Sequence, residues 1–181
     1  FGLGLTSVFI IQDKTTYGQG VADEFQKRFQ AIGGTVLGYE GITAGEADYS
    51  AVEEMIRATG AQAVFFGGIY PEGGLLIKQL KEKGIEVAFL GPDGMDSAEL
   101  VSIAGDAVIG TYYTSVAADI SGTEKGAAFA AAYTAKYNKH SEGFAAYGYD
   151  AMNVALDGIK KAIADNGGAL PTRAQVATAI R

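Results

Sequence analysis

The sequence of 181 residues contains no cysteine and a single histidine, His140. The absence of cysteine excludes thiol nucleophiles, thiolate-ligated iron-sulfur clusters and covalent haem attachment, and one histidine excludes a zinc site built from several. A serine-histidine-aspartate triad would depend on His140. Because that residue lies in the polar stretch 138–142, it is typical of a solvated loop rather than of a catalytic base.

Positive charge is also scarce, with 14 lysines and arginines against 21 acidic residues and a net charge of -7. Proteins that bind nucleic acid need a basic surface to displace phosphate counterions. We therefore expect no nucleic-acid partner.

Long apolar runs are missing as well, since a membrane-spanning helix needs about 20 apolar residues in sequence. The longest candidate, residues 1–11, is broken by Gly2 and Gly4. That segment has neither a cationic start nor a cleavage site with small residues, so we do not expect it to be a signal peptide. The sequence alone does not indicate the compartment.

Motifs that hold phosphate or activate a nucleophile are absent. Residues 68–73 have the G-x-x-x-x-G spacing, but Gly74-Leu75 follow where a phosphate-binding loop needs lysine and a hydroxyl residue. No G-x-G-x-x-G follows the first apolar run, and the strained G-x-S-x-G turn is missing. We expect a protein that is not an enzyme and that has no cofactor, no metal ligands and no catalytic residues.

What is present is a regular alternation of short apolar runs and helical patterns. Apolar residues make up 48% of the chain, so it can fold around a core. Helical spacing of apolar residues occupies 21–32, 52–59, 71–80 and 97–104. The runs that precede and separate these patterns are predicted strands at 7–12, 35–42, 63–68, 86–91 and 108–115. The alternation predicts an α/β fold with a doubly wound, mainly parallel five-stranded sheet of flavodoxin-like order 2-1-3-4-5.

The pattern changes after residue 115, where only helices are predicted, at 123–138, 145–164 and 171–181. The sheet already has four helices to cover it, so the apolar stripes of the additional helices lack a partner. We expect residues 1–117 to form one unit and residues 118–181 a crossover with helices. Part of the protein is then expected to lie outside this chain.

Candidate functional residues follow the predicted strands, because ligands of doubly wound sheets bind beyond the carboxyl ends of the strands. This rim is acidic and aromatic and contains Asp13, Tyr17, Glu46, Tyr70, Glu72 and Asp93. Such a rim suits a cation or an ammonium group. Each residue also has a structural interpretation: Asp13 as a helix cap, Asp93 as a turn residue in Gly-Pro-Asp-Gly, and Tyr17 as a packing residue at a helix start.

Several of these segments together resemble the branched-chain amino-acid (Leu/Ile/Val) binding proteins, type I periplasmic solute-binding proteins of ABC transporters. The resemblance is carried in order by residues 13–20 (DKTTYGQG), 41–50, 67–72, 91–94 and 104–107. It implies two lobes that close on an amino acid, a membrane permease as partner, and a periplasmic or cell-surface location. This chain resembles the second lobe of the type I fold, followed by helices that return to a missing first lobe. That lobe supplies the donors for the ligand carboxylate.

The resemblance also implies roles for individual residues. Tyr17 matches the cleft tyrosine of the family, and Asp93 stands where an acidic residue, commonly glutamate, pairs with the ligand ammonium. Ile69 replaces an aromatic residue, with Tyr70 beside it, and Phe144 matches a later aromatic. The expected ligand-binding residues are therefore Tyr17, Asp93, Ile69, Tyr70 and Phe144.

Two alternatives remain open on the residues alone. One is a Mg²⁺-dependent phospho-acceptor or enzyme domain on a flavodoxin-like sheet, which would use Asp13 and Asp93. It is disfavoured because the third run ends in Gly67-Gly68-Ile69 rather than in an acceptor aspartate. The other is a fragment that exchanges its C-terminal helices with a second copy to form a homodimer.

Overall fold

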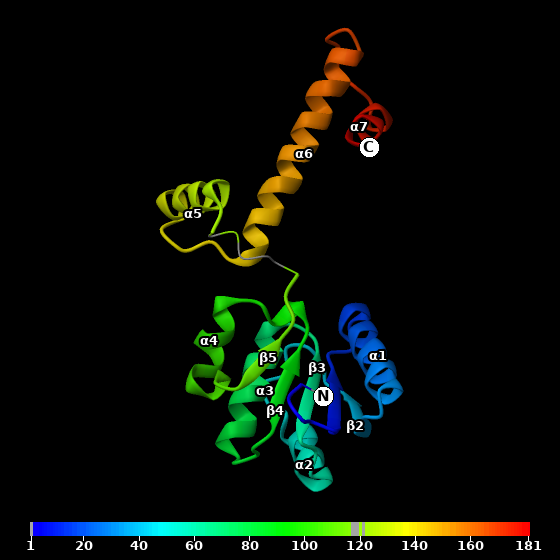
Figure 1. Ribbon diagram of the computed structural model, residues 1–181, viewed down its shortest axis with the longest axis vertical. Coiled ribbons are helices and arrows are strands. Elements are labelled where there is room, and N and C mark those ends of the chain that lie inside the picture. The colour runs from blue at the N-terminus through cyan, green and yellow to red at the C-terminus, as the bar shows by residue number, and fades with distance from the viewer. Residues whose placement is uncertain (1, 117–119, 121) are drawn as a thin grey trace. The chain divides into compact units, whose positions relative to one another are not determined.

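The computed structural model describes residues 2–116, 120 and 122–181. The chain divides into two compact units, Phe1–Val116 and Ala117–Arg181 (Figure 1). The boundary expected between residues 117 and 118 falls within 117–119, which lie outside the described residues. Each unit is described by itself below.

The first unit contains a parallel sheet whose strand order is β2-β1-β3-β4-β5. Its strands are β1 (Ser7–Gln12), β2 (Thr35–Gly41), β3 (Ala63–Gly67), β4 (Ala88–Gly91) and β5 (Thr111–Tyr113). Every neighbouring pair is parallel. The predicted doubly wound sheet and its order are thereby confirmed.

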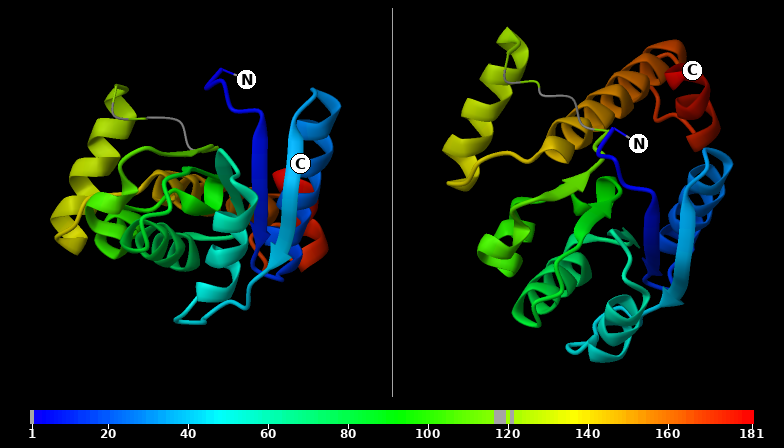
Figure 2. Two further views of the ribbon diagram at one scale, coloured as in Figure 1. Left: turned by 90° about the horizontal axis from the view of Figure 1, so that it is seen from below. Right: turned by 60° about the horizontal axis from the view of Figure 1, so that its bottom comes forward.

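Helices cover both faces of this sheet (Figure 2). The helix α1 (Thr16–Ala31) packs on one face, where Ala22 and Phe29 join a core cluster with Val8 and Ile10 of β1. The other face holds a larger cluster that includes side chains of α2 (Ser50–Thr59), α3 (Tyr70–Glu82) and α4 (Ala98–Ala104). The right-handed crossovers of parallel strands produce this division of the helices.

Burial explains why β1 and β3 form the centre of the sheet. All five residues of β3 are buried, as are the last five of β1. Apolar residues on both faces of a strand require helices on both sides, as parallel sheets provide. In β2, at the edge, every residue is exposed or half-buried.

Two predicted strands, at 35–42 and 63–68, end one residue earlier in the structure, and two others differ by two residues or more. The fourth was predicted from residue 86, but β4 begins at Ala88, because its ladder with β3 begins at the pair Ala63–Ala88. The fifth was predicted over 108–115, but β5 covers only Thr111–Tyr113. A 3₁₀ helix, η2 (Gly105–Val108), takes up the start of that run, and Gly110 with a φ of +90° turns the chain into β5.

The second unit consists of α5 (Glu124–Tyr137), α6 (Gly143–Asp165) and α7 (Arg173–Ile180), as the apolar spacing predicted. Thr172 begins α7 with a capping box that includes Gln175. Ile180 of α7 packs where Gly158 of α6 has no side chain. Many large apolar side chains of this unit remain exposed, among them Tyr149, Met152 and Leu156.

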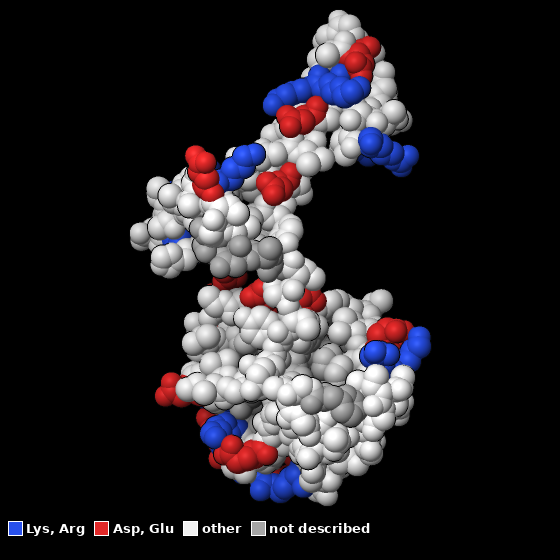
Figure 3. Space-filling view, viewed as in Figure 1, with Lys and Arg blue, Asp and Glu red and all other residues white. Residues whose placement is uncertain are grey.

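Some charged side chains form surface pairs of opposite sign, five of them among the described residues. On the face shown in Figure 3, basic groups lie beside acidic ones, in line with ion pairs such as Lys161–Asp165 at 2.7 Å and Lys27–Glu24 at 3.5 Å. Exposed pairs of this kind contribute little to stability. Among the described residues, no helix combines the length and apolar character that crossing a membrane requires.

Candidate functional site

The carboxyl ends of β1, β3 and β4 bring three of the predicted site residues together. Tyr17 is the second residue of α1, Ile69 directly precedes α3, and Asp93 opens the short 3₁₀ helix η1 (Asp93–Met95). The Tyr17 hydroxyl donates a hydrogen bond of 2.7 Å to Asp93 Oδ1. Three segments that are far apart in sequence thus meet at one edge of the sheet.

Gly94 makes this close approach possible. A Cβ at Gly94 would lie 2.7 Å from the carbonyl oxygen of Gly68 and 3.0 Å from both Ile69 Cγ2 and the Tyr17 hydroxyl. The Gly94 amide also donates a 3.1 Å hydrogen bond to that hydroxyl. A side chain at position 94 would therefore push the Asp93 turn away from Tyr17 and Ile69.

The Asp93 carboxylate is half-buried and keeps one oxygen available. Tyr17 occupies Oδ1, and no residue that the structure describes donates a hydrogen bond to Oδ2. Tyr17 and Ile69 are 40% and 43% exposed beside it. A fixed carboxylate with a free oxygen next to an apolar side chain can bind a cationic group through a charge-assisted hydrogen bond.

The Tyr17 phenol is held in its neutral form. Partial burial and the hydrogen bond to Asp93 raise its pKa to about 12. A negative phenolate next to the Asp93 carboxylate is disfavoured. Tyr17 is therefore a donor at neutral pH, and it directs its proton to Asp93.

Other acidic residues of the predicted rim accept hydrogen bonds from backbone amides. Asp13 is 3% exposed, and its Oδ1 accepts hydrogen bonds from the amide and the hydroxyl of Thr15, which caps α1. Glu72 Oε1 accepts a 3.0 Å hydrogen bond from the Gly45 amide, and Glu46 Oε2 lies 3.3 Å from the Thr43 amide.

The burial of Asp13 also bears on the Mg²⁺-dependent alternative. Asp13 would have to share an ion with Asp93, but its carboxylate is committed to the start of α1. Within the described part of the chain, no cluster of three or more potential metal-ligating side chains is arranged to hold an ion. The phospho-acceptor interpretation therefore has no support.

Two predicted site residues lie elsewhere. Tyr70 packs against the larger core cluster with its partly buried ring. Phe144 is in the second unit, in the first turn of α6, and 42% exposed. Their roles in ligand binding stay predictions.

Sequence reasoning missed a second carboxylate, Asp96, which follows η1. Its Oδ2 accepts a 2.5 Å hydrogen bond from the Ser115 hydroxyl, and its Oδ1 lies 3.4 Å from the Tyr113 hydroxyl. Burial and the Asp96 charge raise the pKa of Tyr113. No sequence motif marks this contact, because its partners are about twenty residues apart and meet only through the pairing of β4 with β5.

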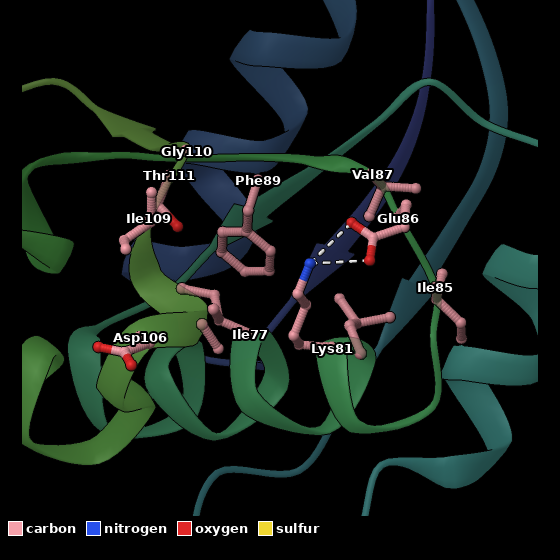
Figure 4. A pocket seen from close by; sticks show the side chains of 12 residues that line it. Ile77, Lys81, Ile85, Glu86, Val87, Phe89, Asp106, Ile109, Gly110 and Thr111 are labelled. Carbon is pink, nitrogen blue, oxygen red and sulfur yellow. Dashed lines mark hydrogen bonds and ion pairs between the residues drawn. The ribbon is translucent and has the colours of Figure 1, made fainter.

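A separate cavity of about 310 Å³ lies at the opposite, amino-terminal edge of β4 and β5 (Figure 4). Ile77, Leu80 and Phe89 form its buried floor. Lys81 and Glu86 line its side and pair with each other at 2.8 Å. It contains none of the predicted site residues.

Comparison with known proteins places these features in a family. The sequence profile of the family described as periplasmic binding protein matches residues 2–181. A Leu/Ile/Val-binding protein homolog 1 from Brucella abortus is 45% identical over 107 residues, which are 59% of this chain and 29% of that protein. A leucine-, isoleucine-, valine-, threonine- and alanine-binding protein from Pseudomonas aeruginosa is 37% identical over 156 residues, 86% of this chain and 42% of that protein.

Solved structures of similar fold agree with this family match. A leucine-binding protein from Thermotoga maritima matches 99% of this chain with a TM-score of 0.85 and 30% identity. The substrate-binding protein of a branched-chain amino acid transporter from Streptococcus pneumoniae, in complex with isoleucine, matches 98% with a TM-score of 0.83 and 25% identity.

The chain spans less than half of the two curated relatives and about half of the two structures, 50% and 49%. The five-stranded sheet in its order 2-1-3-4-5, the rim at its carboxyl edge and the profile match over nearly all residues agree with one another. The chain belongs to the periplasmic binding protein family.

Proposed function

We propose that this chain is part of a non-catalytic solute-binding protein that recognises an aliphatic, branched-chain-like amino acid for uptake through an ABC transporter. The proposal rests on the geometry of the Asp93 carboxylate. Tyr17 fixes its Oδ1 at the rim by a hydrogen bond, and its Oδ2 stays available for a ligand. The ligands in the names of the two relatives and the isoleucine in the streptococcal structure support this class of solute.

In this proposal Asp93 accepts a hydrogen bond from the α-ammonium group of the ligand. A carboxylate that is already fixed by a neutral donor loses little conformational entropy when the ligand arrives. Ile69 offers an apolar contact next to it, since its Cγ2 lies at the Gly94 turn. Tyr70 and Phe144 are proposed as further ligand-binding residues from the family resemblance.

In the proposed domain organisation, residues 1–117 form the second ligand-binding lobe, and residues 118–181 form the crossover and helices of the first lobe. Large apolar side chains of α6 are exposed, for example Met152 at 59%. Burying such side chains is favourable by about 1.5–3 kcal/mol each. A sheet of the first lobe would cover them and would supply the donors for the ligand carboxylate.

The proposed setting of the protein is the periplasm or the cell surface, with a membrane permease of an ABC transporter as its partner. The family match supports this setting.

Isothermal titration of the complete two-lobed protein with the standard L-amino acids tests the proposed function. We expect heat with branched-chain amino acids and weak or no heat with the acidic ones, because the Asp93 site is negative. Absence of heat with every amino acid would contradict the proposal. The 181-residue chain alone is expected to bind weakly or not at all, since the proposed first-lobe donors are missing.

A further inference from the structure

The short turn that carries Asp93 is a stiff unit. The Asp96 amide donates a 3.0 Å hydrogen bond to the Asp93 carbonyl, which closes the turn. Met95, between the two, is 0% exposed. Its side chain lies over the backbone of Gly73 and Gly91, where added Cβ atoms would come within 2.4 and 2.5 Å of it. A buried anchor in a close-packed core resists deformation, so the two ends of the turn move together.

One end of this turn faces the candidate ligand site. Asp93 accepts the Tyr17 hydroxyl at 2.7 Å, and the Gly94 amide donates to the same hydroxyl at 3.1 Å. Any displacement of the turn therefore moves the carboxylate that we propose for the ligand ammonium.

The other end holds the segment by which the chain leaves the first unit. The last backbone bond between this segment and β4 runs from the Thr114 amide to the Gly91 carbonyl, at 3.1 Å. Ser115 lies beyond that bond, and the first unit ends at Val116. The Asp96 carboxylate accepts the hydroxyls of Ser115 and Tyr113, which lie on either side of Thr114.

We propose that Asp96 is a positioning residue that ties the exit segment, residues 113–116, to the Asp93 turn, so that movement of this segment and the placement of the Asp93 carboxylate are coupled. The inference rests on the proposed function, because it concerns the same binding site. Hinged closure of two domains around a ligand concentrates backbone rotation in the few residues that connect the domains. Through Asp96, the exit segment is hydrogen-bonded directly to the turn that carries Asp93.

Amide hydrogen exchange of the complete protein without ligand tests the coupling. Ser115→Ala removes an exposed hydroxyl that lies outside the turn, so the fold is expected to persist. We expect the amides of Gly94 and Asp96 to exchange about threefold faster or more, because the turn opens more often when Asp96 loses this partner. Ser115→Thr keeps the hydroxyl and is expected to restore the exchange rates of the original protein.

Tyr112→Phe is the matched control, since it removes an exposed hydroxyl from β5, next to Tyr113, that is not bonded to Asp96. It is expected to leave the exchange of Gly94 unchanged. Faster exchange confined to residues 113–116 in Ser115→Ala, with Gly94 and Asp96 unchanged, would overturn the coupling. Equal effects in Ser115→Ala and Tyr112→Phe would overturn it as well.

Titration with L-leucine separates the coupling from the proposed function. If the complete protein binds L-leucine, Ser115→Ala is expected to weaken binding about threefold, and its effect is expected to be non-additive with that of Tyr17→Phe, because both act on one turn. Additive effects would count against the coupling. If no amino acid binds, the proposed function fails, while the exchange rates still decide whether Asp96 transmits movement of the exit segment.

Discussion

Asp93 differs from the other buried or half-buried carboxylates of the rim in the hydrogen-bond partners of its oxygens. Asp13 directs its Oδ1 to Thr15 and so to the start of α1, and Glu72 directs its Oε1 to Gly45. Asp93 accepts from a side chain 76 residues away. Its free Oδ2 belongs to a half-buried residue, whereas the unbonded Oε2 of Glu72 is fully buried. A sequence pattern alone cannot separate these cases, because all three residues directly follow a strand or open a helix.

Tyr17→Phe tests the contact that fixes Asp93. We expect the variant to lose about 1–2 kcal/mol of unfolding free energy at neutral pH, since it loses the hydrogen bond to the charged Asp93 acceptor and the one that the hydroxyl accepts from the Gly94 amide. The difference in unfolding free energy between the variant and the original protein should shrink at high pH. The pKa of Tyr17 is raised from 10.0 to about 12, so the unfolded chain releases the proton first and the original protein loses stability across this range.

Urea unfolding at neutral pH and at about pH 11 measures both effects. Tyr112→Phe is the control at neutral pH, where little change is expected. A Tyr17→Phe variant that loses stability between pH 10 and 12 as steeply as the original protein would contradict the assigned pKa.

At Tyr49, in contrast to Tyr17, removal of the hydroxyl is expected to stabilise the protein. The side chain is 2% exposed, and its hydroxyl has no hydrogen-bond partner among the described residues. An unsatisfied buried hydroxyl is costly, so Tyr49→Phe should stabilise the protein by about 1 kcal/mol. Tyr39→Phe is the matched comparison and should destabilise it, because the Tyr39 hydroxyl donates to Asp23. Urea unfolding of both variants measures the two changes in unfolding free energy. A destabilised Tyr49→Phe would contradict the unbonded state of the Tyr49 hydroxyl.

Part of the site was predictable at the level of residues. Tyr17 and Asp93 were selected because they follow strands of a doubly wound sheet, and Ile69 was selected from the family resemblance. The structure brings the three residues together at one edge. The hydrogen bond between Tyr17 and Asp93 was not predictable, because it depends on the side-chain directions of two separate turns. Asp96 was missed for the same reason.

Among the elements, the start of α1 depends on close contact between two backbones. Gly18 is buried in the first turn of α1, and an added Cβ would come within 2.1 Å of Asp13 Oδ1 and 2.4 Å of the Gly67 carbonyl oxygen. Gly20 is in the same helix, and nothing lies within 4 Å of its added Cβ. One helix therefore contains a glycine that packing requires and another that it does not.

Alanine substitutions of these two glycines should have opposite effects. Gly18→Ala should destabilise the protein by about 2 kcal/mol or more, because backbone must shift to admit the methyl group. Gly20→Ala should stabilise it by about 0.5–1 kcal/mol, since alanine favours a helix more than glycine does. Thermal or urea unfolding measures both. Equal effects of the two substitutions would contradict the packing at the start of α1.

The elements themselves were largely predictable from periodicity. Buried runs such as Val8 to Ile11 and Ala63 to Phe66 contain apolar residues on both faces, which is typical of central parallel strands. The start of α1 was predicted too late, because the stretch from Thr16 to Gly20 has no apolar stripe and its cap is the Thr15 hydroxyl. The shortened β4 and β5 were missed because their bounds depend on pairing with neighbouring strands rather than on composition.

For the molecule as a whole, the exposed apolar side chains of the second unit predict self-association of the isolated chain. Tyr149, Met152 and Leu156 are 57%, 59% and 43% exposed on α6, and a contiguous apolar surface favours association. We expect light scattering of the 181-residue chain to show a mass that rises with concentration. Exchange of C-terminal helices between two copies would give a homodimer.

A double substitution provides the control for this prediction. Met152→Lys with Leu156→Lys places charge on that face of α6 and should reduce association. A strictly monomeric original chain at all concentrations would contradict the prediction.

The most direct test of the central claim compares two ligands on two proteins. The claim is that Asp93 binds the ammonium group of an aliphatic amino acid. The complete two-lobed protein and its Asp93→Asn variant are titrated with L-leucine and with 4-methylpentanoate, which lacks the ammonium group, and Asp106→Asn serves as the control at the opposite edge of the sheet. We expect Asp93→Asn to weaken L-leucine binding by about thirtyfold or more and to leave 4-methylpentanoate binding unchanged or stronger. An equal effect of Asp93→Asn on both ligands would contradict the account.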